Sequence, residues 1–268
     1  MAHYIPNILT DYISGGSRSS SRNGGPWGST IHMRDIISQL DIYNNPDNPI
    51  NLNFYSKSSQ TIAQLTHTLI SKHYENGCPA NSHGYIFGGY CDVTEMYRND
   101  HYYLNNRYVF YEEATFNMSV SIAYNHLIHE LAYSCNRLRS EGIRPCYATI
   151  PSASLEKWND YRMYRGRTAL LLHEERYPQM QIDLNTVLSK INSFICKLNL
   201  WNEMYTPYVA GTVMRTKTSG GGQRILQFHK LHDGVHADDK LIVEWADKFR
   251  TAIKKKQKCY IQQPSRSV

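Results

Sequence analysis

The chain has 268 residues and a net charge of +6, with 41% apolar and 19% charged residues. This composition is ordinary for a folded globular domain and argues against collagen-like and disordered chains. No run approaches the roughly 20 apolar residues of a transmembrane helix, and the start of the chain lacks the basic and then apolar pattern of a signal peptide, so we expect an intracellular protein, cytoplasmic or nuclear.

Strand and helix patterns alternate along the chain. Short apolar runs predict strands at 5–13, 50–55, 84–89, 143–150 and within 200–208, although periodicity alone leaves helix open for the first. Apolar residues on one helical face predict helices at 30–40, 61–73, around 120–138 before Gly142, at 182–198, and from 238 or 239 to about 256. A hairpin is expected within 212–228, around Gly220, Gly221 and Gly222.

Three segments interrupt this alternation: a Gly/Ser/Arg loop at 15–28 and polar insertions at 93–116 and 152–180. Alternating strands and helices predict parallel βαβ units with helices on both faces of a sheet. We therefore expect a single α/β domain over residues 1–258, a three-layer α/β/α sandwich with a mostly parallel, flavodoxin-like five-stranded sheet. Residues 259–268 are expected to form a short tail.

Four short motifs follow the expected strands, where ligands bind in such sheets. In chain order they are Gly16-Ser17, Ser59-Gln60-Thr61-Ile62, Gly89-Tyr90-Cys91-Asp92 and Asp233-Gly234-Val235-His236. Their order resembles the sequence blocks of the SGNH (GDSL) hydrolases. That family has a serine turn after the first strand, a glycine after the second, a GxND turn after the third and a DxxH loop before the last helix. The resemblance covers roughly residues 8–256, and the DGVH loop is its most family-like element.

The resemblance implies a serine esterase that acts on a small ester or acylated substrate and needs neither a metal nor an organic cofactor. It makes Ser17 the nucleophile, His236 the general base and Asp233 the residue that orients the histidine. A serine hydroxyl attacks an acyl carbon only when a base takes its proton, and that base needs a carboxylate to fix its tautomer. Their separation of three residues lets the aspartate and the histidine point into one cleft.

The serine assignment has alternatives, because further serines lie in or near the same loop: Ser19, Ser20, Ser21 and Ser29. We favour Ser17 because it directly follows two glycines at the end of the expected strand. Ser29 opens the next helix, where serine is a good N-cap. A Gly/Ser/Arg stretch is also typical of a solvated linker, and this interpretation stays open.

The oxyanion-binding positions depart from the family pattern. The family holds the developing oxyanion with the serine N–H, the backbone N–H of the block-two glycine and the block-three asparagine side chain. Ser59 takes the glycine's place and still offers its backbone N–H, but Cys91, a weak donor, takes the asparagine's place beside Asp92. Losing one donor costs about 10²–10³ in rate. Either catalysis is slow, or Asn81 or Tyr90 substitutes, or the site has lost its hydrolytic role.

Other residue clusters have competing interpretations. His126, His129 and Glu130 resemble a metal set, but they do not match HExxH, and an exposed helix face explains them better. A divalent-ion hydrolase stays open because metal-binding residue types gather late in the chain, at His229, His232, Asp233, His236, Asp238 and Asp239. Cys146 is better explained as a buried apolar residue than as a nucleophile.

The cysteines predict a reducing compartment. The chain has six, with no CxxC pair and no secretion signal, so we expect reduced thiols rather than a disulfide framework.

A second functional hypothesis is a non-catalytic binding or structural protein, of viral or mobile-element type, that keeps the fold. Residues 211–258 hold 11 Lys/Arg against 5 Asp/Glu, which accounts for the whole net charge. The basic residues Lys254, Lys255, Lys256 and Lys258 are candidates for contact with nucleic acid or another anionic surface, although they also suit the last turns of a helix. The tyrosine-rich stretch 97–111 is a candidate for a substrate lid or for self-association into a homo-oligomer.

Overall fold

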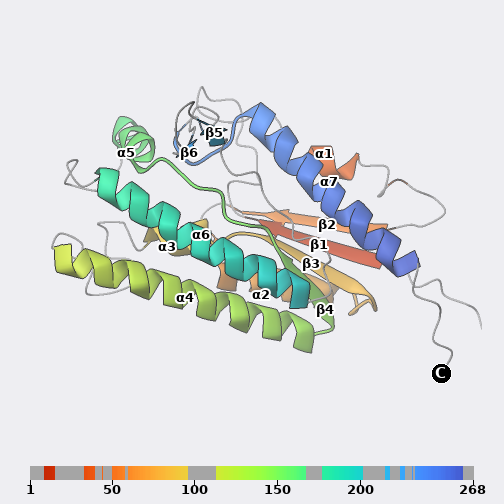
Figure 1. Cartoon of the computed structure of the whole chain (residues 1–268). Helices are drawn as coiled ribbons and strands as arrows, with labels where there is room; N and C mark the ends of the chain where they lie inside the picture. The colour runs from red at the N-terminus through yellow and green to blue at the C-terminus, as the bar shows by residue number, and fades with distance from the viewer. Residues whose placement is uncertain are drawn as a thin grey trace, which may run out of the picture.

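The computed structural model describes residues 9–15, 33–39, 44, 50–57, 60–95, 113–166, 177–201, 215–217, 224–226, 231 and 233–261. The strands in these ranges are β1 Leu9–Gly15, β2 Ile50–Ser56, β3 Ser82–Phe87, β4 Ile143–Tyr147, β5 Arg215–Lys217 and β6 Arg224–Leu226. The helices are α1 Met33–Ser38, α2 Ile62–Glu75, α3 Tyr90–Glu95, α4 Glu113–Ser140, α5 Leu155–Tyr164, α6 Tyr177–Trp201 and α7 Asp239–Ile261. Figure 1 shows how they are arranged.

Strands β1 to β4 form one parallel sheet in the order β2-β1-β3-β4. The register places Tyr12 of β1 beside Asn53 of β2 and beside Gly84 of β3. Parallel neighbours need a crossover connection, and helices supply it here. This order is that of a flavodoxin-like sheet without its last strand. The predicted α/β fold with a parallel sheet is therefore confirmed.

The fifth strand that we expected within residues 200–208 is not formed in the described part of the chain. Helix α6 continues through Leu200 to Trp201, and residues 202–214, which include the rest of the expected range, lie outside the described residues. The helix extends this far because Ile195 and Leu198 remain buried against the core. The short strands β5 and β6 form a separate antiparallel pair, which confirms the hairpin expected within 212–228.

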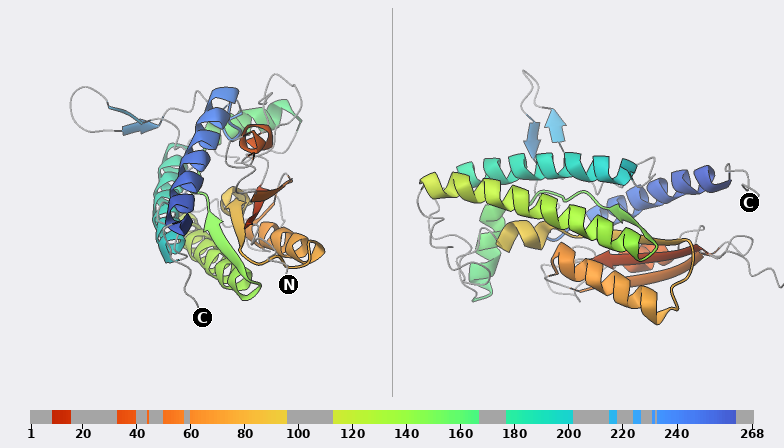
Figure 2. Two further views of the ribbon diagram at one scale, coloured as in Figure 1. Left: turned by 90° about the vertical axis from the view of Figure 1, so that its right-hand side faces the viewer. Right: turned by 90° about the horizontal axis from the view of Figure 1, so that it is seen from below.

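Helices cover both faces of the sheet, as Figures 1 and 2 show. Successive side chains of a strand alternate between the faces. Tyr12 accordingly joins the core that is shared with α2, α4 and α6, whereas Ile13 joins the core with α1 and α7. In the second core the ring of Phe249 lies 5.1 Å from the ring of Tyr85, between centroids. Full burial of a side chain of this size contributes roughly 1.5–3 kcal/mol. The three-layer sandwich is thus confirmed.

Helix α2 begins at a capping box. The Thr61 side chain accepts the N–H of Gln64, and the Gln64 side chain accepts the N–H of Thr61 at 2.9 Å. One side of the helix is apolar and buried, including Leu65 and Leu69. The sequence pattern therefore predicted both the helix and the direction of its buried face.

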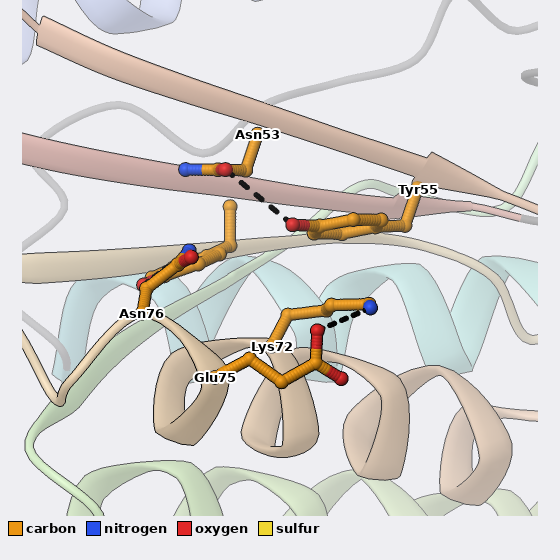
Figure 3. A network of polar contacts seen from close by, with 6 residues as sticks. Asn53, Tyr55, Lys72, Glu75 and Asn76 are labelled. Carbon is orange, nitrogen blue, oxygen red and sulfur yellow. Dashed lines mark hydrogen bonds and ion pairs between the residues drawn. The ribbon is translucent and has the colours of Figure 1, made fainter.

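A polar network joins the edge strand β2 to the last turns of α2 (Figure 3). The Tyr55 hydroxyl donates to Asn53 Oδ1 at 3.4 Å, and the Lys72 ammonium lies 5.5 Å from the centroid of the Tyr55 ring. Lys72 also pairs with Glu75 at 2.5 Å. Burial raises the pKa of the Tyr55 phenol and Lys72 partly opposes this effect, so Tyr55 stays neutral and acts as a donor.

The two predicted insertions contain more regular structure than we expected. Residues 152–180 include all of α5 and the first turn of α6, and α4 already begins at Glu113, inside the expected insertion 93–116. Ser154 caps α5 by accepting the N–H of Lys157 at 3.3 Å. Helix α5 has little amphipathic pattern to reveal it, because charged and amide residues make up half of its length and its apolar residues do not gather on one face.

None of the helices in the described part of the chain is long and apolar enough to cross a bilayer.

Candidate active site

The carboxyl ends of β1 to β4 lie at one edge of the sheet, because the strands run parallel. β1 ends at Gly15, whose carbonyl oxygen accepts the N–H of Lys57, just after β2, at 2.9 Å. Ser17 and Ser59 follow these two strands, but both lie outside the described residues. The structure describes the loops after β3 and β4 and the loop that carries Asp233 and His236.

The Asp233–His236 loop is closed at both of its ends. Leu231 and Ala237 form an antiparallel bridge across it. Directly afterwards Asp238 caps α7, since its carboxylate accepts the N–H of Leu241 at 2.8 Å. A loop that is fixed on both sides holds its side chains in defined directions.

Asp233 and His236 form a hydrogen-bonded pair. Asp233 Oδ2 lies 2.5 Å from His236 Nδ1, while Oδ1 accepts the backbone N–H groups of Val235 at 2.9 Å and of His236 at 2.7 Å. The Asp233 side chain is 2% exposed and that of His236 is 20% exposed. The carboxylate is thus buried behind an imidazole that reaches solvent.

The pKa of the Asp233 carboxyl lies below its ordinary value. Burial alone would raise this pKa, but the hydrogen bond and the charge of His236 and the N–H groups of His236 and Val235 favour the ionised form more strongly. Asp233 is therefore a carboxylate at neutral pH. Such a carboxylate keeps the proton of a neutral imidazole on Nδ1, which leaves the Nε2 lone pair for a proton from outside.

Gly234, which lies between Asp233 and His236 in the loop, packs against the start of α5. Its φ of +84° is in the left-handed region, and a Cβ added there would lie 2.6 Å from the Ser154 carbonyl oxygen and 2.7 Å from the Trp158 nitrogen. The Ser154 N–H donates to the Gly234 carbonyl oxygen at 2.8 Å. Only glycine fits this backbone conformation in this space. The DGVH motif therefore needs its glycine for contact with a segment that the sequence interpretation treated as an insertion.

Trp158 of α5 lies beside the imidazole. Its ring meets that of His236 edge to face, with centroids 5.7 Å apart, and stacks on Tyr161 at 5.6 Å. Trp158 also packs against the core shared with α6. The indole restricts one side of His236 and adds an aromatic surface to this part of the site.

The turn after β3 touches the same segment. Gly89 has a φ of +97°, and a Cβ there would lie 2.5 Å from Ile150 Cδ1. Ile150 and Ser154 both belong to the stretch between β4 and α5. This stretch therefore lies between the Gly89 turn and the Asp233–His236 loop and contacts both.

Asp92 and Cys91 follow on α3. Asp92 is buried, and its carboxylate accepts the N–H of Ile62, the first residue of α2, at 3.1 Å. A carboxylate at a helix N-terminus is stabilising, so Asp92 connects the second and third motifs. Cys91 is half-buried. The second and third motifs thus meet through the bond between Asp92 and Ile62, and the third and last motifs both contact the β4–α5 stretch.

The two alternative oxyanion donors lie at different ends of the sheet. Tyr90 is buried at the start of α3, directly after Gly89 and at the carboxyl edge. Asn81 directly precedes β3, at the opposite edge, with a left-handed φ of 59°. Asn81 was therefore a wrong candidate, whereas Tyr90 stays a candidate.

The remaining candidates have limited support in the described residues. No group of three or more His, Cys, Asp or Glu side chains in those ranges is arranged to hold a metal ion. His126 and His129 are exposed on α4, as a polar helix face predicts.

The other candidates include some that the structure does not describe. His229 and His232 lie outside the described residues, as do the side chains of the basic cluster at 254–258. Cys146 is buried, as predicted, and Cys78, Cys91, Cys135, Cys146 and Cys196 form no disulfides with one another.

Sequence reasoning missed Ser154 and Trp158, which hold the Asp233–His236 loop. One signal was present: Ser154 precedes an acidic residue and a tryptophan, as an N-cap precedes a helix. The polarity of the whole segment obscured that signal.

Comparisons with known proteins identify the fold. No family model matches the sequence, and neither does any curated protein. Among solved structures, a lipase from a goat rumen metagenome superposes with a TM-score of 0.53 and 12% identity, over 91% of this chain and 97% of its own. A lipase/acylhydrolase from Enterococcus faecalis gives 0.51 and 10%, over 93% and 97%. A GDSL-like lipase from Bacteroides thetaiotaomicron gives 0.50 and 14%, over 92% and 88%.

Proposed function

We propose that this chain, which has the SGNH hydrolase fold, is a serine esterase in which Ser17 is the nucleophile, His236 the general base and Asp233 its orienting carboxylate. Three observations support the proposal: the parallel sheet with its carboxyl-edge loops, the paired aspartate and histidine on one loop, and the glycine-serine sequence that follows β1.

The observation that carries the proposal is the 2.5 Å contact between Asp233 Oδ2 and His236 Nδ1. A buried carboxylate in this position stabilises the imidazolium that forms when Nε2 takes a proton. The carboxylate itself remains ionised throughout. Asp233 Oδ1 also accepts hydrogen bonds from two backbone N–H groups. These bonds fix the carboxylate in place, whereas the carboxylate of a surface ion pair is usually free to rotate.

The proposed reaction has two steps, acylation of Ser17 and deacylation by water. The Ser17 hydroxyl oxygen attacks the acyl carbon while His236 Nε2 takes the hydroxyl proton. The tetrahedral intermediate then collapses, the alkoxide leaves with that proton as an alcohol, and an acyl-serine remains. Water attacks the acyl-serine with His236 again as the base, and the acid is released with Ser17 restored.

We expect turnover to be slow. The family pattern puts an asparagine amide on the developing oxyanion, and Cys91 stands at that position in this chain. A thiol is a weak donor, and the loss of one oxyanion donor costs about 10²–10³ in rate. The Tyr90 hydroxyl, at the same turn, is the candidate replacement.

A fluorophosphonate probe tests the proposal directly. The purified full-length chain is incubated with the probe, and the labelled peptide is identified by mass spectrometry, alongside hydrolysis of p-nitrophenyl acetate. Ser17→Ala and His236→Ala are expected to abolish both signals, whereas Ser19→Ala and Ser29→Ala, the matched controls, retain them. Labelling of a different serine would overturn the Ser17 assignment. A folded chain that neither reacts with the probe nor cleaves the ester would overturn the function.

Two further experiments test the competing hypotheses, a metal-dependent hydrolase and a non-catalytic binding protein. Turnover that is lost in EDTA and restored by a divalent cation would favour the metal interpretation of the late histidine and aspartate residues. A chain without esterase activity that binds nucleic acid, and loses binding as salt rises or when Lys254, Lys255 and Lys256 become glutamine, would favour the non-catalytic hypothesis.

A further inference from the structure

One face of α6 carries a row of carboxamide side chains that bind the stretch between β4 and α5. Asn199 Oδ1 accepts the N–H of Tyr147 and its Nδ2 donates to the carbonyl oxygen of the same residue, both at 2.8 Å. Asn192 binds Ile150 in the same two ways, at 2.7 and 2.9 Å. Asn185 receives a hydrogen bond from the Ser152 hydroxyl.

The row ends at Gln181. Its Oε1 accepts the N–H of Leu155 at 2.9 Å and its Nε2 donates to the carbonyl oxygen of Ala153 at 2.8 Å. Nε2 also donates to Asn185 Oδ1 at 3.1 Å. A single carboxamide thus binds the peptide groups on both sides of Ser154.

The spacing of these residues matches the two backbones. Positions 181, 185, 192 and 199 fall within about 40° of one another on a helix with 3.6 residues per turn. Seven helical residues rise about 10.5 Å, and three extended residues span about 10 Å. The seven-residue step from Asn199 to Asn192 therefore matches the three-residue step from Tyr147 to Ile150.

Asn199 acts on the side of β4 where a next strand would pair. Ala148 donates its N–H to the carbonyl oxygen of Ile86 in β3 at 2.8 Å. In a strand, neighbouring residues direct their peptide groups to opposite sides, so those of Tyr147 point away from β3. The fully buried Asn199 side chain binds both the N–H and the carbonyl oxygen of Tyr147 on that side.

The last member of the row reaches the candidate active site through Ser154. The Ser154 N–H donates to the Gly234 carbonyl oxygen at 2.8 Å. Gly234 connects Asp233 to Val235 and His236, and the backbone N–H groups of those two residues also bind the Asp233 carboxylate. A shift of the 153–155 peptides would therefore be transmitted to the orientation of the imidazole.

We infer that Asn199 replaces strand pairing at the end of β4, that the α6 carboxamides together hold the 147–155 stretch in place, and that Gln181 is a positioning residue for His236. Gln181 acts through Ser154 and touches neither the imidazole nor the reacting atoms. Its effect on reaction rate rests on the proposed function, whereas its effect on the geometry of His236 does not.

The test compares two carboxamides of the same row. Gln181→Met keeps side-chain length and loses both backbone hydrogen bonds. Asn199→Leu is the matched control, because it loses an equivalent pair of bonds at the other end of the row. Thermal unfolding, the rate of fluorophosphonate labelling and the NMR titration of the His236 ring are measured for both variants in the full-length chain.

We expect Gln181→Met to slow labelling at least tenfold and to change the His236 titration curve, with both variants less thermally stable than the parent. Asn199→Leu should stay within twofold of the parent rate and keep its titration curve. If Gln181→Met does not fold, Gln181→Glu, which keeps the acceptor for Leu155 and loses the donor to Ala153, replaces it. Parental labelling and titration in the Gln181 variant, or equal losses in both variants, would overturn the inference. If the parent itself is not labelled, the proposed function fails and the His236 titration alone decides the positioning role.

Discussion

The backbone N–H of Ser154 donates to the carbonyl oxygen of Gly234 at 2.8 Å, across 80 residues of sequence. This bond joins the N-terminus of α5 to the loop between Asp233 and His236. The loop is consequently held from outside its own sequence, in addition to the Leu231–Ala237 bridge and the Asp238 cap at its ends. Changes at this contact should affect the histidine more strongly than changes of similar size elsewhere.

Gly234→Ala should destabilise the chain by roughly 2–5 kcal/mol, the sum of left-handed strain and of overpacking against the Ser154 carbonyl oxygen and the Trp158 nitrogen. Gly142→Ala is the matched control. Gly142 also has a left-handed φ, of +76°, but a Cβ there meets nothing within 4 Å, so only the strain of about 1–2 kcal/mol applies. Urea unfolding measures both. Equal losses of unfolding free energy in the two variants would show that the close packing of Gly234 against Ser154 and Trp158 does not contribute to the cost of the substitution.

Asp233→Asn should lower the labelling rate and ester turnover by up to about 10⁴, because an amide does not hold the imidazole in the required tautomer. Asp238→Asn is a suitable control, since asparagine also caps a helix well. A loss under tenfold in Asp233→Asn would exclude the proposed orienting role.

The pH dependence of stability provides a separate check on Asp233. Its pKa is lowered in the folded chain, so the stabilisation is complete above the unfolded pKa of about 4 and disappears as pH falls through the lower folded value. The difference in unfolding free energy between the parent and Asp233→Asn should therefore shrink as pH falls below about 4. A difference that kept growing below about pH 4 would contradict the direction of the shift.

Trp158→Ala should slow labelling by between tenfold and 10²-fold, because the imidazole loses the indole that restricts one side of it. Trp158→Phe keeps an aromatic edge and should recover most of the rate. Tyr161→Leu removes only the ring that stacks on Trp158, so it should slow labelling less than Trp158→Ala does. A Trp158→Ala protein with the parental rate would mean that the ring contact does not orient His236.

Asp92→Asn should change the labelling rate by less than threefold, in contrast to Asp233→Asn. The Asp92 carboxylate binds the N–H of Ile62 at the start of α2, and an asparagine oxygen still accepts that bond. The stability loss should stay near 1 kcal/mol, as for a weakened helix cap. Loss of labelling in a stable Asp92→Asn protein would instead place this carboxylate in the chemistry.

The sequence predicted the sheet and most of the helices because their apolar periodicity is strong and each buries one face. The Asp233–His236 pair was predictable for a different reason, since both residues lie within one loop whose spacing limits their separation. The role of Ser154 was not predictable, because a hydrogen bond between residues 154 and 234 leaves no periodic trace in either segment.

The fifth strand shows a different limit of prediction. In the sequence, residues 200–208 come after an expected helix and before an expected hairpin, where an α/β pattern places a strand. Helix α6 runs to Trp201, residues 202–208 lie outside the described part of the chain, and the α6 asparagines bind peptide groups at and just after the end of β4. Carboxamides at 185, 192 and 199, spaced by seven, were visible in the sequence. Their meaning depended on which backbone they would meet, and tertiary structure decides that.

The packing of α1 against α7 has a consequence for biosynthesis. Ile37 and Phe249 share one core with Ile13 and Tyr85, although more than 200 residues separate the two helices in sequence. A nascent chain on the ribosome therefore exposes that side of its sheet until the last helix has been translated. Contacts of such long sequence separation fold slowly. We expect the newly made chain to depend on chaperone protection, and any premature termination before α7 to yield an aggregating product.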